Sequence, residues 1–147
     1  MKHGAAKTFT TVAAFVDTNL LVYAYDRKAG QKHVIARQIV TEMWRSSPRP
    51  WISAQVLSEL QVALVKRGLP LVQAARVSRG YATWRVVDNT AAIFLVAQKI
   101  QQRWQTSLWD ALFLAAAKKS GATEVLSEDM ADGQDYGGVV VRNPFKP

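Results

Sequence analysis

Short runs of branched and aromatic apolar residues alternate along the chain with longer stretches in which apolar residues recur every three or four positions. The short runs predict β-strands, and the longer stretches predict amphipathic helices. The expected strands cover 12–16, 51–53, 83–87, 124–126 and 139–141. The expected helices cover 20–25, 31–45, 54–67, 71–79, 91–104 and 108–120. Because strands that alternate with helices build parallel sheets, the pattern predicts an α/β fold.

Residues between these elements are favourable helix caps and helix breakers. Ser53 precedes one expected helix, Asp88-Asn89-Thr90 precedes another, and Ser107 and Gly121 bracket the last. The connections are short, so we expect one domain over residues 12–147. The residues before it, 1–11, are expected to form a flexible N-terminal extension.

The composition is that of a folded, water-soluble protein. Of the 147 residues, 49% are hydrophobic and 20% are charged, a balance that excludes disorder for most of the chain. The absence of Cys excludes disulfides and cysteine-ligated structural zinc. No apolar stretch approaches the ~20 residues that span a bilayer, and the N-terminus lacks the apolar core of a signal peptide. We therefore expect a cytoplasmic protein that does not enter a membrane.

The net charge of +8 comes from 19 Lys and Arg against 11 Asp and Glu. A positive field of this size attracts polyanions such as nucleic acids. Charge alone is weak evidence, because many basic proteins bind nothing anionic.

Four of the acids occupy positions that a parallel sheet would bring together. Asp17 and Asp129 follow the first and fourth expected strands, and Glu59 and Asp110 lie near the starts of two expected helices. Each has a structural alternative. Asp17 could simply cap the following helix, Glu59 could be a solvated flank, Asp110 could pair with Ser107 in a capping box, and Asp129 could be an ordinary loop acid.

As a group, these carboxylates indicate a metal site. They would repel one another unless a cation lay between them, and oxygen ligands of this kind suit Mg²⁺ or Mn²⁺. Setting the four aside leaves seven acids against 19 cations. An acidic cleft within a basic surface is the arrangement that a metal-dependent nuclease requires.

Four segments resemble the motifs of the PIN-domain ribonucleases, in particular the VapC-type toxins of bacterial toxin–antitoxin pairs. The segments are Phe15-Val16-Asp17-Thr18-Asn19-Leu20-Leu21-Val22-Tyr23-Ala24, Ser53-Ala54-Gln55-Val56-Leu57-Ser58-Glu59-Leu60, Leu108-Trp109-Asp110-Ala111-Leu112, and Leu126-Ser127-Glu128-Asp129-Met130 followed by Asp132-Gly133. The stretch 139–145 is similar to the closing strand and tail of that family. The resemblance implies a three-layer sandwich in which helices flank a five-stranded, mostly parallel sheet.

The resemblance also implies an activity, which is endonucleolytic hydrolysis of RNA by metal-activated water, leaving a 5′-phosphate. Asp17, Glu59, Asp110 and Asp129 would be the catalytic acids and would hold one or two Mg²⁺ or Mn²⁺ ions. Thr18, Asn19 and Ser127 would orient those carboxylates, and Glu128 and Asp132 are further acids beside the fourth motif. The implied partners are an RNA substrate, a cognate antitoxin and a second copy of the chain.

Two other functions remain open at this point. The chain could be a non-catalytic RNA-binding module of the same fold, although all four acids are present. It could also be a Mg²⁺-dependent phosphotransfer domain, although such a site favours a second acid next to Asp17. Histidine acid–base catalysis is disfavoured because the chain has only His3 and His33, and we expect His33 at the surface of the second helix.

Further residues suit contacts with RNA. Arg27, Lys28, Lys32 and Arg37 cluster after the first motif and could follow phosphates. Among the five Trp, Trp51 and Trp84 are expected in the core, whereas Trp109, next to Asp110, could stack on a base.

Overall fold

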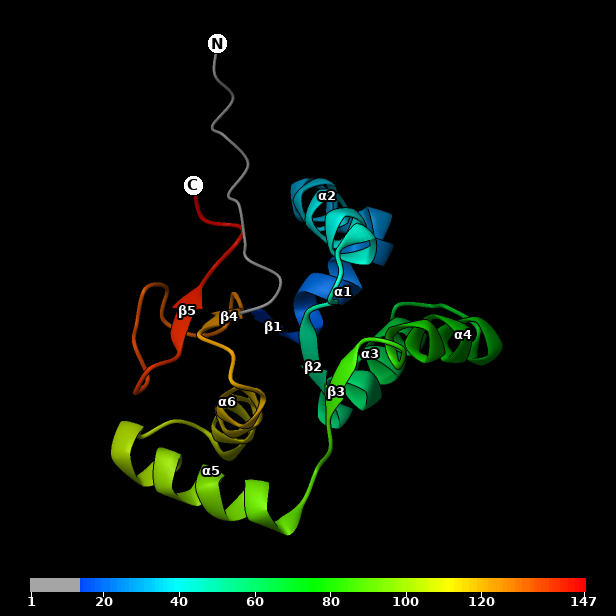
Figure 1. The fold of residues 1–147 in the computed structure, drawn as a ribbon. Helices are drawn as coiled ribbons and strands as arrows, with labels where there is room; N and C mark the ends of the chain where they lie inside the picture. The colour runs from blue at the N-terminus through cyan, green and yellow to red at the C-terminus, as the bar shows by residue number, and fades with distance from the viewer. Residues whose placement is uncertain (1–13) are drawn as a thin grey trace.

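The computed structural model describes residues 14–147, which form one α/β layer structure (Figure 1). Its sheet has five strands in the order β3-β2-β1-β4-β5, and all four pairings are parallel. The strands are β1 (Ala14–Val16), β2 (Trp51–Ser53), β3 (Arg85–Val87), β4 (Glu124–Leu126) and β5 (Val140–Arg142). The expected five-stranded parallel sheet is therefore confirmed. The expected extension over 1–11 and the first two residues of the 12–16 strand lie outside the described residues.

Helices cover both faces of the sheet (Figure 1). They are α1 (Thr18–Tyr25), the 3₁₀ turn η2 (Arg27–Ala29), α2 (Gln31–Arg45), α3 (Ala54–Lys66), α4 (Leu71–Tyr81), α5 (Ala91–Trp104) and α6 (Leu108–Ser120). The chain moves from β1 to β2 to β3 in one direction and then returns across β1 to β4. Because crossovers between parallel strands are right-handed, the return places α5 and α6 on the face opposite α1–α4.

The central strands are buried on both faces, as parallel strands between two helical layers must be. All three residues of β1 have no exposed surface, and neither do Val125 and Leu126 of β4. On one side, the ring of Phe15 packs edge-on against Phe113 of α6, with 4.9 Å between centroids. These contacts fix α6 against the strand that leads to Asp17.

Element boundaries differ from the expectation by one or two residues. Helix α1 begins at Thr18, two residues earlier than expected, because Asp17 caps it. Strand β3 begins at Arg85, two residues later than expected. The backbone N–H of Trp84 donates a hydrogen bond to the Tyr81 carbonyl at 2.9 Å, so the residues before Arg85 form a turn that follows α4. The Trp84 ring is buried in the core, as expected. Trp51 is only partly buried, with the Arg85 guanidinium 4.6 Å from its ring centroid.

The topology creates one switch point, between β1 and β4, where the chain direction across the sheet reverses. Ligands of open α/β sheets bind beyond the carboxyl ends of the strands at such a point. Val16 is paired with Leu126, so Asp17 and Ser127 follow two adjacent strand ends. The backbone N–H of Asp17 donates to the Leu126 carbonyl at 3.0 Å and extends this alignment by one residue.

No helix within residues 14–147 is both long enough and apolar enough to cross a membrane.

The packing of α6 sets the stability of this arrangement. Leu114 is fully buried in α6, so we expect Leu114→Ala to lower the free energy of unfolding by about 2–5 kcal/mol through lost burial and a residual cavity. Urea titration followed by circular dichroism measures the change. The matched control is Val62→Ala in α3, whose side chain is 54% exposed and whose loss should change stability by less than about 0.5 kcal/mol.

Candidate active site

Asp17 holds the position between β1 and α1. Its backbone is extended, and its Oδ1 accepts a hydrogen bond from the Thr18 backbone N–H at 2.7 Å, so it is the N-cap of α1. Its Oδ2 accepts a hydrogen bond from the Ser127 hydroxyl at 2.7 Å. The capping role expected as an alternative is therefore real, but it occupies one carboxylate oxygen and leaves the other facing the loop after β4.

The environment of Asp17 disfavours its charged form. Burial, together with the nearby charges of Asp129 and Glu59, raises its pKa from 3.8 to about 6, although the hydrogen bonds from Ser127 and Thr18 oppose the rise. Within residues 14–147, no Lys or Arg forms an ion pair with this carboxylate. The protein thus keeps a carboxylate in a place where it lacks a neutralising partner.

Asp129 lies on the same loop as Ser127. Its Oδ2 accepts a hydrogen bond from the Asn19 side-chain amide at 2.7 Å, and its backbone N–H donates to the Ser127 hydroxyl oxygen at 3.2 Å. Burial raises the pKa of Asp129, and the charges of Glu128 and Asp110 raise it further. One serine hydroxyl therefore contacts both strand-end acids.

Glu59 and Asp110 approach the same region from two helices. Ser53 caps α3, and the Glu59 side chain, on the exposed border of that helix, accepts a long hydrogen bond of 3.5 Å from the Thr18 hydroxyl. Asp110 lies in the first turn of α6, and its backbone N–H donates to the Ser107 hydroxyl at 3.1 Å. Its charge raises the pKa of Asp129.

The four predicted acids therefore form one electrostatically connected set. Asp17 interacts with Asp129 and Glu59, and Asp129 interacts with Asp110. Each predicted supporting residue contacts a different acid: Ser127 bonds Asp17, Asn19 bonds Asp129, and Thr18 bonds Glu59. The structure thus brings together seven side chains that the sequence distributes over more than a hundred positions.

The two further acids of the fourth motif have other contacts. Both oxygens of Glu128 accept hydrogen bonds, one from the Tyr23 hydroxyl and one from the Lys32 ammonium at 2.7 Å. Asp132 Oδ1 accepts a hydrogen bond from the Asn143 backbone N–H at 2.8 Å, which fastens the segment after β5. Glu128 is thus neutralised by a cation, whereas Asp132 stabilises the chain terminus.

The sequence did not predict that Tyr23 donates a hydrogen bond to Glu128, beside the four acids. Asn19 and Tyr23 are four residues apart on α1 and therefore share one face of the helix. Asn19 binds Asp129 from that face, and Tyr23 binds the adjacent Glu128. The i, i+4 spacing of the two polar residues in an apolar helix was the available signal.

The donor chemistry fits a hard divalent cation that keeps part of its water shell. Mg²⁺ is usually held by one or two carboxylates and several waters, unlike a structural metal in a closed cage of protein ligands. Within residues 14–147, no group of three or more His, Cys, Asp or Glu side chains is arranged so that it could hold a metal ion. Asp17 accepts a hydrogen bond from the Ser127 hydroxyl, and Asp129 accepts one from the Asn19 amide, so a polar donor stabilises the charge of each carboxylate.

Comparisons with known proteins agree with this fold. A sequence model of the PIN domain matches residues 14–131. No curated protein sequence matches the chain.

Among solved structures, a toxin–antitoxin complex from Klebsiella pneumoniae is similar with a TM-score of 0.64 and 23% identity, covering 91% of this chain and 99% of that one. VapC20 of Mycobacterium tuberculosis, a toxin that cleaves the sarcin–ricin loop, has a TM-score of 0.64 and 26% identity, covering 88% and 99%. VapBC2 from Rickettsia felis, bound to a DNA fragment from its promoter, has a TM-score of 0.58 and 15% identity, covering 88% and 97%.

The raised pKa of Asp17 predicts a variant that is more stable than the wild type. At neutral pH, ionising Asp17 in the folded state costs stability, because a tenfold change in proton affinity is worth about 1.4 kcal/mol. Asn is uncharged and is an equally good N-cap. We therefore expect Asp17→Asn to raise the free energy of unfolding, measured by urea titration in EDTA at neutral pH, by about 1–3 kcal/mol.

The pH dependence of the stability difference between Asp17→Asn and the wild type tests whether the charge of Asp17 causes it. A carboxyl group with a raised native pKa contributes full stability while protonated, below its ordinary pKa of 3.8, and loses that contribution as the pH rises through about 6. The advantage of Asp17→Asn should therefore be small near pH 4 and complete above about pH 7. An advantage that does not change with pH would contradict the electrostatic explanation.

Proposed function

The chain belongs to the PIN domain family, and on that premise we propose that it is a Mg²⁺- or Mn²⁺-dependent endoribonuclease that acts as the toxin of a bacterial toxin–antitoxin pair. The observation that carries the proposal is the connected set of four carboxylates beyond the β1–β4 switch point of a strongly basic protein. Such a set of carboxylates attracts a divalent cation, while the remaining basic surface attracts the phosphates of RNA.

We assign Asp17, Glu59, Asp110 and Asp129 as the side chains that hold one or two ions, directly or through water. When bound, such ions polarise a phosphoryl oxygen, lower the pKa of water and stabilise the leaving oxygen. A carboxylate offers about four lone-pair positions, so the single hydrogen bond at each Asp17 oxygen leaves room for a further ligand.

Neighbouring polar side chains hold these carboxylates in place. The Ser127 hydroxyl bonds Asp17 and accepts from the Asp129 backbone, so it fixes the spacing of the two strand-end acids. The Asn19 amide fixes the orientation of the Asp129 carboxylate. Outer groups of this kind orient metal ligands and tune their basicity.

The substrate class follows from charge and from one exposed aromatic residue. Trp109 is 66% exposed and precedes Asp110 in the first turn of α6. An exposed indole beside a nuclease site is suited to stack on an unpaired base, which favours single-stranded or looped RNA. The similarity to a toxin described as cleaving the sarcin–ricin loop, at 26% identity, supports an RNA substrate.

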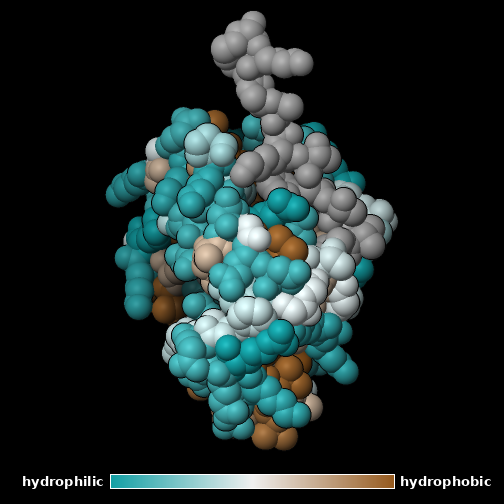
Figure 2. Space-filling view, turned by 90° about the vertical axis from the view of Figure 1, so that its left-hand side faces the viewer, coloured by the Kyte–Doolittle hydropathy of each residue, from teal (hydrophilic) through white to brown (hydrophobic). Residues whose placement is uncertain are grey.

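The proposed partners are an antitoxin and a second copy of the chain. Helix α5 exposes Phe94, Leu95 and Val96 by 40%, 58% and 42%, respectively. In Figure 2, apolar side chains gather at the lower end of the molecule, where α5 lies in Figure 1. Such a surface suits a protein partner, and two of the similar structures contain toxin and antitoxin together. A toxin directed at RNA would act in the cytoplasm.

Cleavage of RNA tests the proposed function directly. We expect the protein to cleave single-stranded RNA with Mg²⁺ or Mn²⁺, leaving 5′-phosphate ends, and EDTA to abolish cleavage. Asp110→Asn should lower the rate by at least about 100-fold, because it removes one charge from the metal-binding set. Sequencing of RNA ends and gel-based initial rates measure both effects.

The control for this substitution is Asp88→Asn, which removes an exposed carboxylate that follows β3, two strands away from β1 in the sheet. It should cleave at the wild-type rate. Full metal-dependent cleavage by Asp110→Asn would contradict the proposed site, and RNA binding without any cleavage would indicate a non-catalytic RNA-binding protein.

The serine between the two strand-end acids should tune metal affinity. Ser127→Ala removes the hydrogen bond to Asp17 and the acceptor for the Asp129 backbone, so we expect a loss of about 10–100-fold in apparent metal affinity. Metal titrations of the cleavage rate should show that excess Mg²⁺ restores much of the activity. The matched control is Ser58→Ala on the exposed side of α3, which removes only a hydrogen bond to the Ala54 carbonyl. It should change neither the apparent metal affinity nor the cleavage rate.

A further inference from the structure

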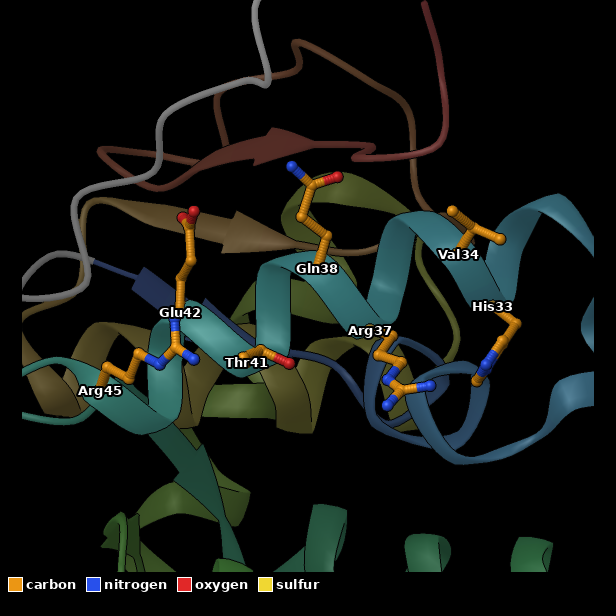
Figure 3. Close-up of a pocket in the computed structure, with 7 residues that line it drawn as sticks. All are labelled: His33, Val34, Arg37, Gln38, Thr41, Glu42 and Arg45. Carbon is orange, nitrogen blue, oxygen red and sulfur yellow. The ribbon is translucent and has the colours of Figure 1, made fainter.

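The outward face of α2 carries a groove that the active site does not use. Side chains four residues apart line up along a helix, and two such rows form the walls, as Figure 3 shows. One row contains Val34, Gln38 and Glu42, and the other contains His33, Arg37, Thr41 and Arg45. The hollow that they line has a volume of about 530 Å³, which is enough for part of an extended polar ligand.

The groove continues towards the end of α1. A second hollow of about 480 Å³ is lined by Ala24, Tyr25 and Arg27, and it shares His33 and Arg37 with the first. The two hollows therefore adjoin each other at His33 and Arg37, and we refer to them together as the α2 channel.

The channel is positively charged. Arg27, Arg37 and Arg45 line it and are exposed, and among its described lining residues Glu42 is the one acid. Within residues 14–147, none of these three arginines forms an ion pair. Nearby Lys32 and Arg67, by contrast, are bound to Glu128 and Asp26. The guanidinium groups in the channel are thus available to an anionic ligand from outside.

One end of the channel is linked through Lys32 to the loop that carries Asp129. The Nδ1 atom of His33 is 2.8 Å from the Tyr23 carbonyl oxygen, and the preceding residue, Lys32, donates to Glu128. Glu128 is the neighbour of Asp129 in the loop after β4. A strand lying across the four carboxylates could therefore pass Lys32 and enter the channel without crossing the molecule.

From this arrangement we propose that the α2 channel binds the sugar–phosphate backbone of the RNA strand that flanks the cleaved bond. Guanidinium groups pair with phosphates through two parallel hydrogen bonds. Gln38 and Thr41 add donors and acceptors suited to phosphate and 2′-hydroxyl groups. The inference deepens the proposed ribonuclease function, since it names a surface that would position the substrate.

The lining residues favour RNA over a docked peptide helix. A helix that packs into a groove inserts an apolar ridge against apolar partners. The α2 face offers only Val34 for that purpose among its described lining residues, and the other side chains of this hollow are polar or charged. Arginine spaced at eight residues, from Arg37 to Arg45, covers about 12 Å of helix rise, which suits an extended polyanion.

The test is RNA binding under conditions that prevent cleavage. Fluorescence anisotropy with labelled oligouridine in EDTA compares the wild type with the double variant Arg37→Gln/Arg45→Gln over a range of salt concentrations. Each phosphate contact to a single strand contributes about 0.7 to the slope of log affinity against log salt. We expect the double variant to lower that slope by about 1.4 and to bind roughly tenfold more weakly at low salt.

A matched control separates the channel from general charge. Arg76→Gln/Arg79→Gln removes two exposed arginines from α4 and the same net charge, and it should bind oligouridine nearly as the wild type does. Equal losses in the two double variants, or no loss in either, would overturn the proposal. Thermal unfolding followed by circular dichroism verifies that each variant is folded.

A protein ligand is a distinct outcome of the same experiment. If labelled polyglutamate needs Arg37 and Arg45 but oligouridine does not, the channel binds an acidic peptide and the RNA proposal is wrong. The proposed nuclease activity is judged separately, from cleavage by the wild type with Mg²⁺. Oligouridine binding in EDTA that depends on Arg37 and Arg45 would support RNA binding by the channel even if the wild type did not cleave RNA with Mg²⁺.

Discussion

Repulsion among carboxylates at one edge of the sheet is the constraint on which the rest of this structure depends. Because β1 and β4 pair in parallel, Asp17 and the loop that carries Asp129 both follow the carboxyl ends of adjacent strands and therefore lie next to each other. The fold tolerates this because each acid has a hydroxyl or amide donor, yet the pKa of Asp17 still rises to about 6. The ionised form of Asp17 thus lowers the stability of the fold at the position where we propose that a cation binds.

The distribution of the basic residues complements this constraint. Lys32 neutralises Glu128 next to the cleft, and Arg67 neutralises Asp26 at the end of α1. Neither cation forms an ion pair with the four carboxylates that we propose to bind metal. Arginines that form no ion pair with any described residue lie farther along α2, where they attract an anionic strand without contacting the four acids. The protein therefore has negative carboxylates where we propose that a metal ion binds and positive arginines where we propose that the RNA phosphates bind.

Most of the fold follows from local sequence patterns. The spacing of Val56, Leu60 and Leu64 predicts the buried stripe of α3, and the caps Ser53, Thr90 and Ser107 begin three helices where expected. The convergence of the acids also follows, because the carboxyl ends of parallel strands share an edge. These predictions succeed because they depend on periodicity and on the handedness of crossovers rather than on individual contacts.

Individual contacts could not be derived in the same way. The bond from Ser127 to Asp17 joins residues 110 apart, and its existence depends on strand register. The hydrogen bonds that Tyr23 and Lys32 donate to Glu128 join residues that are 105 and 96 positions apart. Because of these bonds, Glu128 has different partners from Asp129, although the two residues are adjacent in sequence. These two bonds also join the α1–α2 hairpin to the loop that carries Asp129. A small molecule that separated the hairpin from the sheet would therefore displace Asp129, one of the proposed metal-binding carboxylates, without touching it, which offers a route to inhibition that avoids the charged carboxylates themselves.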